Sequence, residues 1–564
     1  MELVPETLNL ELPRRFRHHR GMNGAESLIA APEEHVSAEE ARPAFHRRVW
    51  VWLDVQSRQY HLTRFVLLRF TGLVWFIAFL SAAQQFIPLI GHDGLLPADL
   101  FVQRALEQHG GDPWALFWKA PSLFWFHCDD ATILAVTWTG TVIAFLVMIG
   151  FANALMLFVL WALYLSLLPI GQEWLAYGWD MQILETGFLA MLLAPLWDAR
   201  PFPRRAPPVL IIWLYRWLIF RIMLGAGLIK IRGDAVWSFQ ELSALVYHYE
   251  TQPVPGPLSR FFHLMPLWFH KMECLFNHFV ELVVPWFAFC GRIPRHVAGL
   301  FLLGFQAVLI CTGNLSFLNW LTLIPCLACL DDSFWRRVLP RFITTRAEKA
   351  AQESRRTSMG HWITSVIYAG VVLWLSIAVV KNLFFSQQQA MNDSFDRLHL
   401  VNTYGAFGSI DKERYELVFQ GTDSERLDLM TDWKDYEFKA KPTDVMRRPV
   451  LITPYHYRLD WAAWYPWHKY GGRSAWVPNF LWKLLHNDPA TLGLLARNPF
   501  PEKPPTHVRV LVYLYKYAPP DDPSGAWWTR ERVDTHIPAL SLESPQLRAI
   551  VEQNGWLREA EKAP

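Results

Sequence analysis

Two ionisable residues inside long apolar runs are the first candidates for chemistry. Glu185 lies in the run 180–197, and Arg221 lies in the run 209–230. If the two runs form antiparallel membrane helices, a rise of about 1.5 Å per residue places both side chains at a similar depth. A charge at the bilayer centre costs about 2.5–3.5 kcal/mol on insertion scales, so such residues usually pair or line a functional cavity. The sequence leaves both alternatives open: a structural ion pair, or a substrate or catalytic cavity.

More polar residues follow the run that holds Arg221. Lys230 and Arg232 stand where long side chains extend to the membrane surface, and Asp234 comes next. The segment beyond them carries His248, Glu250, His263, His270, Glu273, His278 and Glu281. The last four include two His-x-x-Glu pairs, which are compatible with a metal site but are explained equally well by a polar helix stripe facing lipid headgroups. We therefore predict no metal ion and no cofactor.

The cysteines indicate little redox chemistry. Six cysteines in 564 residues do not make a disulfide scaffold. Cys326 and Cys329 form a C-x-x-C pair, but they lie in an apolar run, where small residues usually serve packing. Cys128 and Cys274 lie in predicted outer loops and could form a disulfide, since disulfides belong to oxidising compartments. The sequence shows no Ser–His–Asp elbow, P-loop or dinucleotide fingerprint, so no catalytic residue is assigned.

The composition is that of a membrane protein with an added polar domain. Hydrophobic residues make up 52% of the chain and charged residues only 18%, against about 25% charged in an average soluble domain. This excludes a disordered chain, a coiled coil and an ordinary cytosolic enzyme. The net charge of +2 gives no reason to expect a nucleic-acid partner. The sequence does not define an oligomeric state.

Three zones of composition are visible along the chain. Residues 1–60 are polar, with basic clusters around an acidic middle, and are expected to form a largely disordered cytoplasmic tail. Residues 61–385 contain apolar runs, and residues 386–564 read as a soluble domain. We predict nine membrane segments: 65–86, 131–149, 152–168, 180–197, 209–230, 276–290, 297–311, 316–330 and 362–385. The sixth to eighth are shorter than the roughly 17–25 residues of a spanning helix, so they could be tilted, broken or re-entrant.

The distribution of Lys and Arg predicts the orientation of this bundle. With a cytoplasmic N-terminus, the inner segments carry 21 Lys and Arg in 112 residues, and the outer loops, 87–130 and 231–275 among them, carry 5 in 104. This asymmetry is the one that the positive-inside rule predicts. The soluble zone 386–564 is therefore expected on the outer or lumenal side.

The soluble zone is predicted to be β-rich. Apolar and polar residues alternate in 414–420, and both faces of 507–517 are largely apolar or aromatic, which is typical of a central strand. Residues 476–498 carry helical spacing between these strands. The expected fold is thus a multi-pass α-helical bundle followed by a sandwich-like α+β domain with a sheet of five or more strands.

Several segments together resemble the lipase maturation factor family, closest to its type-one members. The matching segments in the first half are LLRFTGLVWFIAFLSAAQQFIPLIGHDGLLPA (67–98), GWDMQILETGFLAMLLAPLW (178–197), RWLIFRIMLGAGLIKIRGD (216–234) and HYETQPVPGPLS (248–259). Those that follow are HFVELVVPWF (278–287), GNLSFLNWLTLIPCLACLDD (313–332), VNTYGAFGSI (401–410) and PYHYRLDWAAWY (454–465). The resemblance covers about residues 60–560 in order.

This resemblance implies a multi-pass protein of the endoplasmic reticulum membrane with a lumenal C-terminal domain. In the family, that domain engages client lipases, especially homodimeric ones such as lipoprotein lipase, and supports their folding and assembly into active, secreted enzyme. The role implied is that of a folding factor rather than a catalyst. Animal members carry cysteines in the lumenal domain and this chain has none there, which is also compatible with a bacterial chain whose domain would lie in the periplasm.

An aromatic segment of the C-terminal zone is the candidate client-binding surface. It comprises Tyr455, His456, Arg458, Asp460, Trp461 and Trp464. Aromatic anchors beside Arg and Asp have the composition of binding hot spots. The alternative is that these aromatics form the core of the domain, with Arg458 and Asp460 as an internal pair.

Two other functions remain as alternatives. The layout is distantly similar to that of the vitamin K-dependent γ-carboxylases, so the chain could be a membrane enzyme acting on a lipid or protein in a cavity of the bundle. Glu185, Arg221, Lys230 and His248 would then be the residues to consider, on fold-level analogy alone. A lipid-handling protein is the other alternative, with membrane lipid as a partner.

Overall fold

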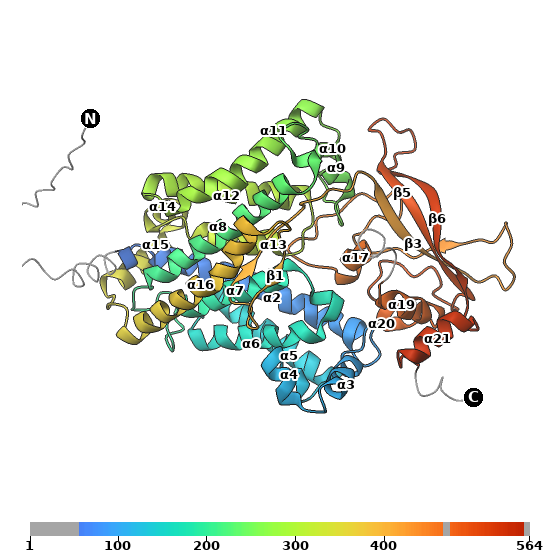
Figure 1. Cartoon of the computed structure of the whole chain (residues 1–564), viewed down its shortest axis with the longest axis horizontal. Helices are drawn as coiled ribbons and strands as arrows, with labels where there is room; N and C mark the ends of the chain where they lie inside the picture. Colours follow the sequence, from blue (N-terminus) through green and yellow to red (C-terminus); the bar gives the residue numbers. More distant parts are fainter. Residues whose placement is uncertain (1–55, 466–473, 558–564) are drawn as a thin grey trace, which may run out of the picture. The chain divides into compact units, whose positions relative to one another are not determined.

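The structure of the chain is a computed structural model that describes residues 56–465 and 474–557 (Figure 1). The predicted N-terminal tail therefore lies almost entirely outside the described residues. Helices dominate as far as Phe385, and the strands follow from Asp393 onward. The predicted fold class is confirmed: a membrane bundle of helices precedes a β-rich region.

Among the described residues, five helices are long and apolar enough to cross a membrane. They are α2 (His61–Ile90), α5 (Asp130–Ile149), α8 (Val209–Arg232), α12 (Arg292–Thr312) and α16 (Met359–Phe385). Three further predicted segments are shorter helices, namely α6 (Ala154–Ile170), α7 (Gly178–Leu193) and α13 (Leu318–Leu327).

The predicted segment 276–290 is not a single α-helix. Helix α11 (Leu267–His278) gives way to a π-helical turn, η4 (Phe279–Val283), and then to a 3-10 turn, η5 (Val284–Phe289). Pro285 stands at the start of the 3-10 turn. A proline lacks the N–H that an α-helix needs and clashes with the preceding turn, so the helix breaks there.

Short helices fill the segments between the long ones. They are α3 (Ala98–Gln108), α4 (Pro113–Lys119), η1 (Leu123–Trp125), η2 (Gln172–Leu175), η3 (Ala235–Trp237), α9 (Ala244–Thr251), α10 (Ser259–His263), α14 (Asp332–Val338) and α15 (Arg341–Gln352). Several helices begin at a capping side chain, such as Asn153 for α6 and Ser358 for α16. Helix α2 is capped from a distance, because the Asp332 carboxylate accepts its first backbone N–H groups at 2.9–3.1 Å.

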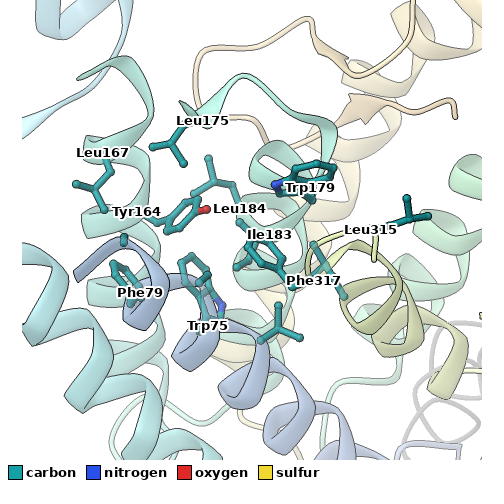
Figure 2. Close-up of a cluster of buried hydrophobic side chains, with 14 of the residues drawn as sticks. Trp75, Phe79, Tyr164, Leu167, Leu175, Trp179, Ile183, Leu184, Leu315 and Phe317 are labelled. Atoms are coloured by element: carbon teal, nitrogen blue, oxygen red, sulfur yellow. The ribbon is translucent and has the colours of Figure 1, made fainter. Parts of the chain in front are cut away.

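Aromatic side chains lie in a buried hydrophobic cluster of the bundle (Figure 2). Trp75 and Phe79 of α2 stack at 5.5 Å, and the Tyr164 ring of α6 meets both edge-on. The Tyr164 hydroxyl donates to Asp180 of α7 at 2.6 Å, so this buried polar group is satisfied. The cluster joins three helices and fixes the position of α7 in the bundle.

The C-terminal region contains one four-stranded antiparallel sheet in the order β4-β3-β5-β6. The strands are β3 (Arg414–Thr422), β4 (Lys434–Asp435), β5 (His507–Tyr517) and β6 (Trp528–Leu540), and a separate pair consists of β1 (Asp393–Ser394) and β2 (Asn402–Thr403). Strand β5 lies between β3 and β6, as predicted for a central strand.

The sheet differs from the expectation in two respects. It has four strands within the described residues instead of five or more, because residues 436–457 form turns and loops. One face is covered by helix α19 (Trp476–Leu485), whose Phe480 ring lies 5.1 Å from Phe419 of β3, instead of by a second sheet. Three further short helices complete this α+β arrangement, namely α17 (Arg458–Ala462), α20 (Pro489–Leu492) and α21 (Pro545–Gln553).

Candidate functional site

Glu185 and Arg221 form an ion pair in the middle of the bundle. Glu185 on α7 and Arg221 on α8 are 2% and 1% exposed, and the Arg221 guanidinium donates directly to the Glu185 carboxylate. The Tyr404 hydroxyl donates to the same carboxylate at 2.7 Å. Asn402 donates from its backbone and its side chain at 3.1 Å, and its carbonyl accepts from Arg221 at 2.7 Å. The pair therefore holds a segment from the C-terminal half inside the bundle.

Gly225 of α8 and Gly233, the residue that follows the helix, allow that segment to lie close to α8. A Cβ atom on Gly225 would stand 2.4 Å from the Tyr404 carbonyl oxygen, and one on Gly233 would stand 2.3 Å from the Gly408 carbonyl oxygen. Both distances are far below normal van der Waals contact. Glycine is thus required at these positions so that the backbone of residues 404–408 can pack directly against α8.

Lys230 does not extend to the membrane surface as expected from its position. It is 4% exposed, and its ammonium lies 2.5 Å from a carboxylate oxygen of Glu281 in the π-helical turn. Asn277 completes the group, because it accepts from Lys230 at 3.3 Å and donates to Glu281 at 2.9 Å. Lys230 is buried instead of exposed because Glu281, on the broken helix, supplies a carboxylate next to it.

The neighbours of Lys230 have structural contacts of other kinds. Arg232 is exposed, as a side chain at the membrane surface should be, and donates to the Leu383 carbonyl. Asp234 caps the turn η3 and accepts from the Ile410 backbone at 3.3 Å. Glu250 accepts from the Tyr517 backbone at 2.9 Å and lies 3.5 Å from His263. The contact of Glu250 with Tyr517 of β5 ties the loop 231–275 to the C-terminal sheet.

His248 is buried beside the segment that α8 holds. It is 8% exposed, and its ring meets Phe407 edge-on at 4.6 Å. Burial, assisted by the positive charge of Lys230, lowers the pKa of the His248 imidazole to about 4.

The lowered pKa of His248 predicts a loss of stability in mild acid. The unfolded chain takes up a proton at this residue near pH 6.5, whereas the folded chain resists it down to about pH 4. The stabilising contribution is therefore complete above pH 6.5 and falls as the pH drops, by about 2 kcal/mol at pH 5. We expect His248→Gln to flatten the fall in thermal midpoint between pH 7.5 and pH 5. The exposed His92 is the control, because His92→Gln should not flatten it.

The histidines and cysteines considered in the sequence analysis do not come together. His270 lies 3.4 Å from Glu273, whereas His278 contacts the Trp237 carbonyl at 2.8 Å, and no group of three potential metal ligands occurs among the described residues. The disulfide considered between Cys128 and Cys274 is absent, and both are free. Cys274 is enclosed in a small apolar cluster around Trp237, while Cys128 packs on the main core, so the two belong to different clusters.

The predicted client-binding segment is mostly buried against the bundle. His456, Arg458, Asp460 and Trp461 are at most 4% exposed, and Tyr455 and Trp464 are half-buried. Arg458 donates to the Trp174 carbonyl at 2.6 Å, and Gln85 of α2 accepts from its backbone at 2.9 Å. The interpretation of these residues as an exposed surface is therefore wrong.

Of the alternative interpretation, the burial of Trp461 in the core is confirmed, but the internal pair of Arg458 and Asp460 is wrong. Asp460 accepts from the backbone of residues 440 and 441, and no contact joins it to Arg458 among the described residues. Arg458 instead lies 4.0 Å from Asp180 of α7. The segment thus fastens the C-terminal region to the helices, because its aromatic residues pack on aromatic residues at the end of the bundle such as Tyr177 and Trp179.

A cavity of about 490 Å³ lies where these elements meet. Its wall is formed by α7, α8, α11, α12 and α13, by the segment 404–409 and by Trp461. Lys230, Glu281 and Asn277 line it, whereas Glu185 and Arg221 do not. Its size is that of a small-molecule site, which typically measures about 300–1,000 Å³.

The sequence analysis missed an exposed apolar loop between β3 and β4. In this loop, residues 423–433, the exposed fractions are 43% for Leu427, 103% for Leu429 and 90% for Met430. Large apolar side chains gathered on a surface often mark an interaction site. The signal in the sequence was the apolar Leu-x-Leu-Met run between acidic residues, which a search for aromatic hot spots passes over.

Comparisons with known proteins point to a single family. The model of the lipase maturation factor transmembrane domain matches residues 62–337, and that of the lipase maturation factor C-terminal domain matches residues 400–538. Lipase maturation factor 1 of Homo sapiens is 44% identical over 520 residues, which cover 88% of this chain and 90% of the human protein.

Two further relatives support the same conclusion. Lipase maturation factor 1 of Mus musculus is 40% identical and covers 98% of both chains. Lipase maturation factor 2 of Homo sapiens is 29% identical, over 89% of this chain and 85% of the relative. No solved structure matches the chain.

Proposed function

The chain belongs to the lipase maturation factor family, and we propose that this multi-pass membrane protein helps client lipases to fold and assemble into active enzyme. The observation that carries the proposal is the match of both family domains, in order, together with identities of 40–44% to relatives named Lipase maturation factor 1. The same matches disfavour a membrane enzyme of the γ-carboxylase layout or a dedicated lipid-handling protein.

We propose that the protein resides in the endoplasmic reticulum membrane, with residues 386–564 in the lumen and membrane lipid around residues 61–385. The excess of Lys and Arg in the predicted inner segments supports this orientation. The end of α16 at Phe385 and the first strand at Asp393 support the boundary between the two regions. The clients would be lipases of the homodimeric, lipoprotein-lipase-like kind.

We propose that the loop 423–433 contacts the client. Before assembly, a lipase exposes apolar lid and dimer surfaces that promote aggregation. Leu429 and Met430 project from the loop with almost no cover, and methionine adapts to irregular apolar surfaces. Because Arg458 and the Glu185–Arg221 pair fasten the C-terminal region to the bundle, the loop is held by a region that is itself attached to the membrane helices.

A rescue assay tests the proposed function. Lipoprotein lipase is co-expressed with the chain in cells lacking their own maturation factor, and secreted activity per unit of lipase mass is measured. The full chain is expected to raise this specific activity, and truncation after Phe385 is expected to abolish the rise. No rise with a correctly inserted chain would contradict the proposed function.

The loop itself is tested by introducing charge at its tip. Leu429→Asp with Met430→Asp is expected to weaken client binding by about tenfold or more, because two apolar contacts are lost and carboxylates are desolvated. Secreted lipase activity should fall accordingly while the chain keeps its thermal midpoint. Ile550→Asp on α21, which also replaces an exposed apolar residue, is the matched control and should rescue fully. Full rescue by the double variant would exclude the loop as the client contact.

A further inference from the structure

We propose that the cavity of about 490 Å³ binds one uncharged, single-chain lipid of the acylglycerol kind, whose head bears hydroxyl and carbonyl groups. The lipid would enter sideways from the bilayer between α11 and α12. This site is independent of the client contact proposed for the loop 423–433.

The mouth of the cavity is apolar and faces outward. Phe276 of α11 and Val308 of α12 both line the cavity and are 40% and 43% exposed, so the proposed opening lies between them. Behind them, the Phe305 ring stands 6.3 Å from the Phe276 ring. α12 is long and apolar enough to span the membrane, so the proposal places this opening at the hydrocarbon, where an acyl chain avoids contact with water.

The inner wall contains polar atoms without a protein partner. The side-chain oxygen of Gln182 has no hydrogen-bond partner among the described residues, although the side chain is fully buried and its nitrogen donates to Thr322 at 3.1 Å. The indole N–H groups of Trp179 and Trp461, 5% and 4% exposed, are also without a partner there. A buried polar group without a hydrogen bond is unfavourable by a few kcal/mol, so one acceptor and two donors call for a ligand with both functions.

Two neighbouring amides extend this polar wall. Asn319 donates to the Gln306 oxygen at 2.8 Å, and within the described part of the chain the Gln306 nitrogen reaches only the Met223 sulfur, at 4.0 Å. A thioether is a weak acceptor. The Gln306 nitrogen therefore has capacity for a better acceptor, such as an ester carbonyl.

The charges of the wall disfavour an anionic head group. Lys230 is the one Lys or Arg among the described lining residues, and Glu281 already neutralises it at 2.5 Å. Glu273, another lining residue, adds a carboxylate that accepts from Tyr249 at 2.9 Å. A phosphate or a fatty-acid carboxylate would meet no free cation there, whereas a glycerol hydroxyl needs none.

The test uses the full chain purified in detergent. 1-Oleoylglycerol is expected to raise its thermal midpoint in a saturable manner, since a ligand that binds only the folded state stabilises it. Oleate and 1-oleoyl-lysophosphatidate, which share the acyl chain but carry negative charge, should shift it far less. Equal or larger shifts with the anionic lipids would overturn the charge argument, and no shift with 1-oleoylglycerol would overturn the proposal.

Two variants of one helix locate the site. Val308→Trp places a large ring in the mouth and is expected to weaken 1-oleoylglycerol binding by about tenfold or more. Val297→Trp makes the same change at a similarly exposed position of α12 outside the cavity wall and should bind normally. Mass spectrometry of lipids extracted from the purified proteins gives a second readout. Acylglycerol should accompany the parent chain and Val297→Trp but be depleted from Val308→Trp, and equal amounts in all three would place any lipid outside this cavity.

Discussion

Replacing Arg221 by methionine is expected to lower the free energy of unfolding of the bundle by about 3–5 kcal/mol. The substitution leaves the Glu185 carboxylate buried at 2% exposure without its cation. It also removes the donor to the Asn402 carbonyl, so the segment 402–404 loses part of its attachment. Because the net stability of a folded protein is only about 5–15 kcal/mol, the variant should yield little folded material.

The measurement is the thermal midpoint of the detergent-purified chain, followed by tryptophan fluorescence. Arg232→Met on the same helix is the control, since Arg232 is exposed and its substitution should shift the midpoint only slightly. Adding Glu185→Gln to Arg221→Met should recover part of the loss, because the unpaired charge is then gone. An Arg221→Met chain as stable as Arg232→Met would show that the pair is not needed for the fold.

The second large effect is expected at Glu416, within β3 of the sheet. Arg414, Glu416 and Lys441 are fully buried, and the Glu416 carboxylate lies between the two cations, 2.6 Å from the Lys441 ammonium. Glu416→Gln leaves two like charges buried together, at a cost of about 3–5 kcal/mol. Arg414 also donates to the Glu250 carbonyl at 2.8 Å and to the Pro253 carbonyl at 2.9 Å. The damage should therefore spread from the sheet to the loop after α9.

Hydrogen exchange separates this effect from a general loss of structure. In Glu416→Gln, the backbone amides of β3 and β5 should exchange much faster, while those of α2 and α5 change little. Glu413→Gln is the matched control. Glu413 is exposed, immediately precedes β3, and contacts only the Tyr415 hydroxyl among the described residues. Unchanged protection of β3 in Glu416→Gln would contradict the role assigned to the buried triad.

The local sequence pattern was sufficient to predict the membrane helices and part of the sheet. Apolar runs are continuous in the sequence, so the predicted segments reappear as helices, and the break near Pro285 follows from chemistry within a few residues. Strand β5 was predicted because both of its faces are apolar. Strand β6 was not, because it lies at the edge of the sheet and carries exposed charges such as Glu531 and Arg532, which obscure the alternation typical of a strand.

The candidate site could be predicted only in part, because its contacts join residues that are far apart in the sequence. The depth of Glu185 and Arg221 could be calculated from helix geometry, but their contacts with Asn402 and Tyr404 join residues more than 180 positions apart. The same limit explains the error at Lys230, whose partner Glu281 lies 51 residues later on a broken helix. The composition of the segment around Arg458 is aromatic and charged, but it does not reveal whether the segment is buried. The burial of Arg458 depends on its hydrogen bonds to Trp174 and Gln85, which are far away in the sequence.

The attachment of Asn402 to the bundle also affects how the chain folds during its synthesis. A ribosome adds about 5–20 residues per second, so the 217 residues between Glu185 and Asn402 take about 10–40 s to synthesise. α7 and α8 are complete well before the end of that interval, but the Glu185 carboxylate still lacks the donors of Asn402 and Tyr404. The nascent bundle lacks the contacts of Glu185 with Asn402 and Tyr404 during this time, and a chain that terminates before Asn402 never forms them. This part of the bundle therefore stays incomplete until the segment around Asn402 has been synthesised.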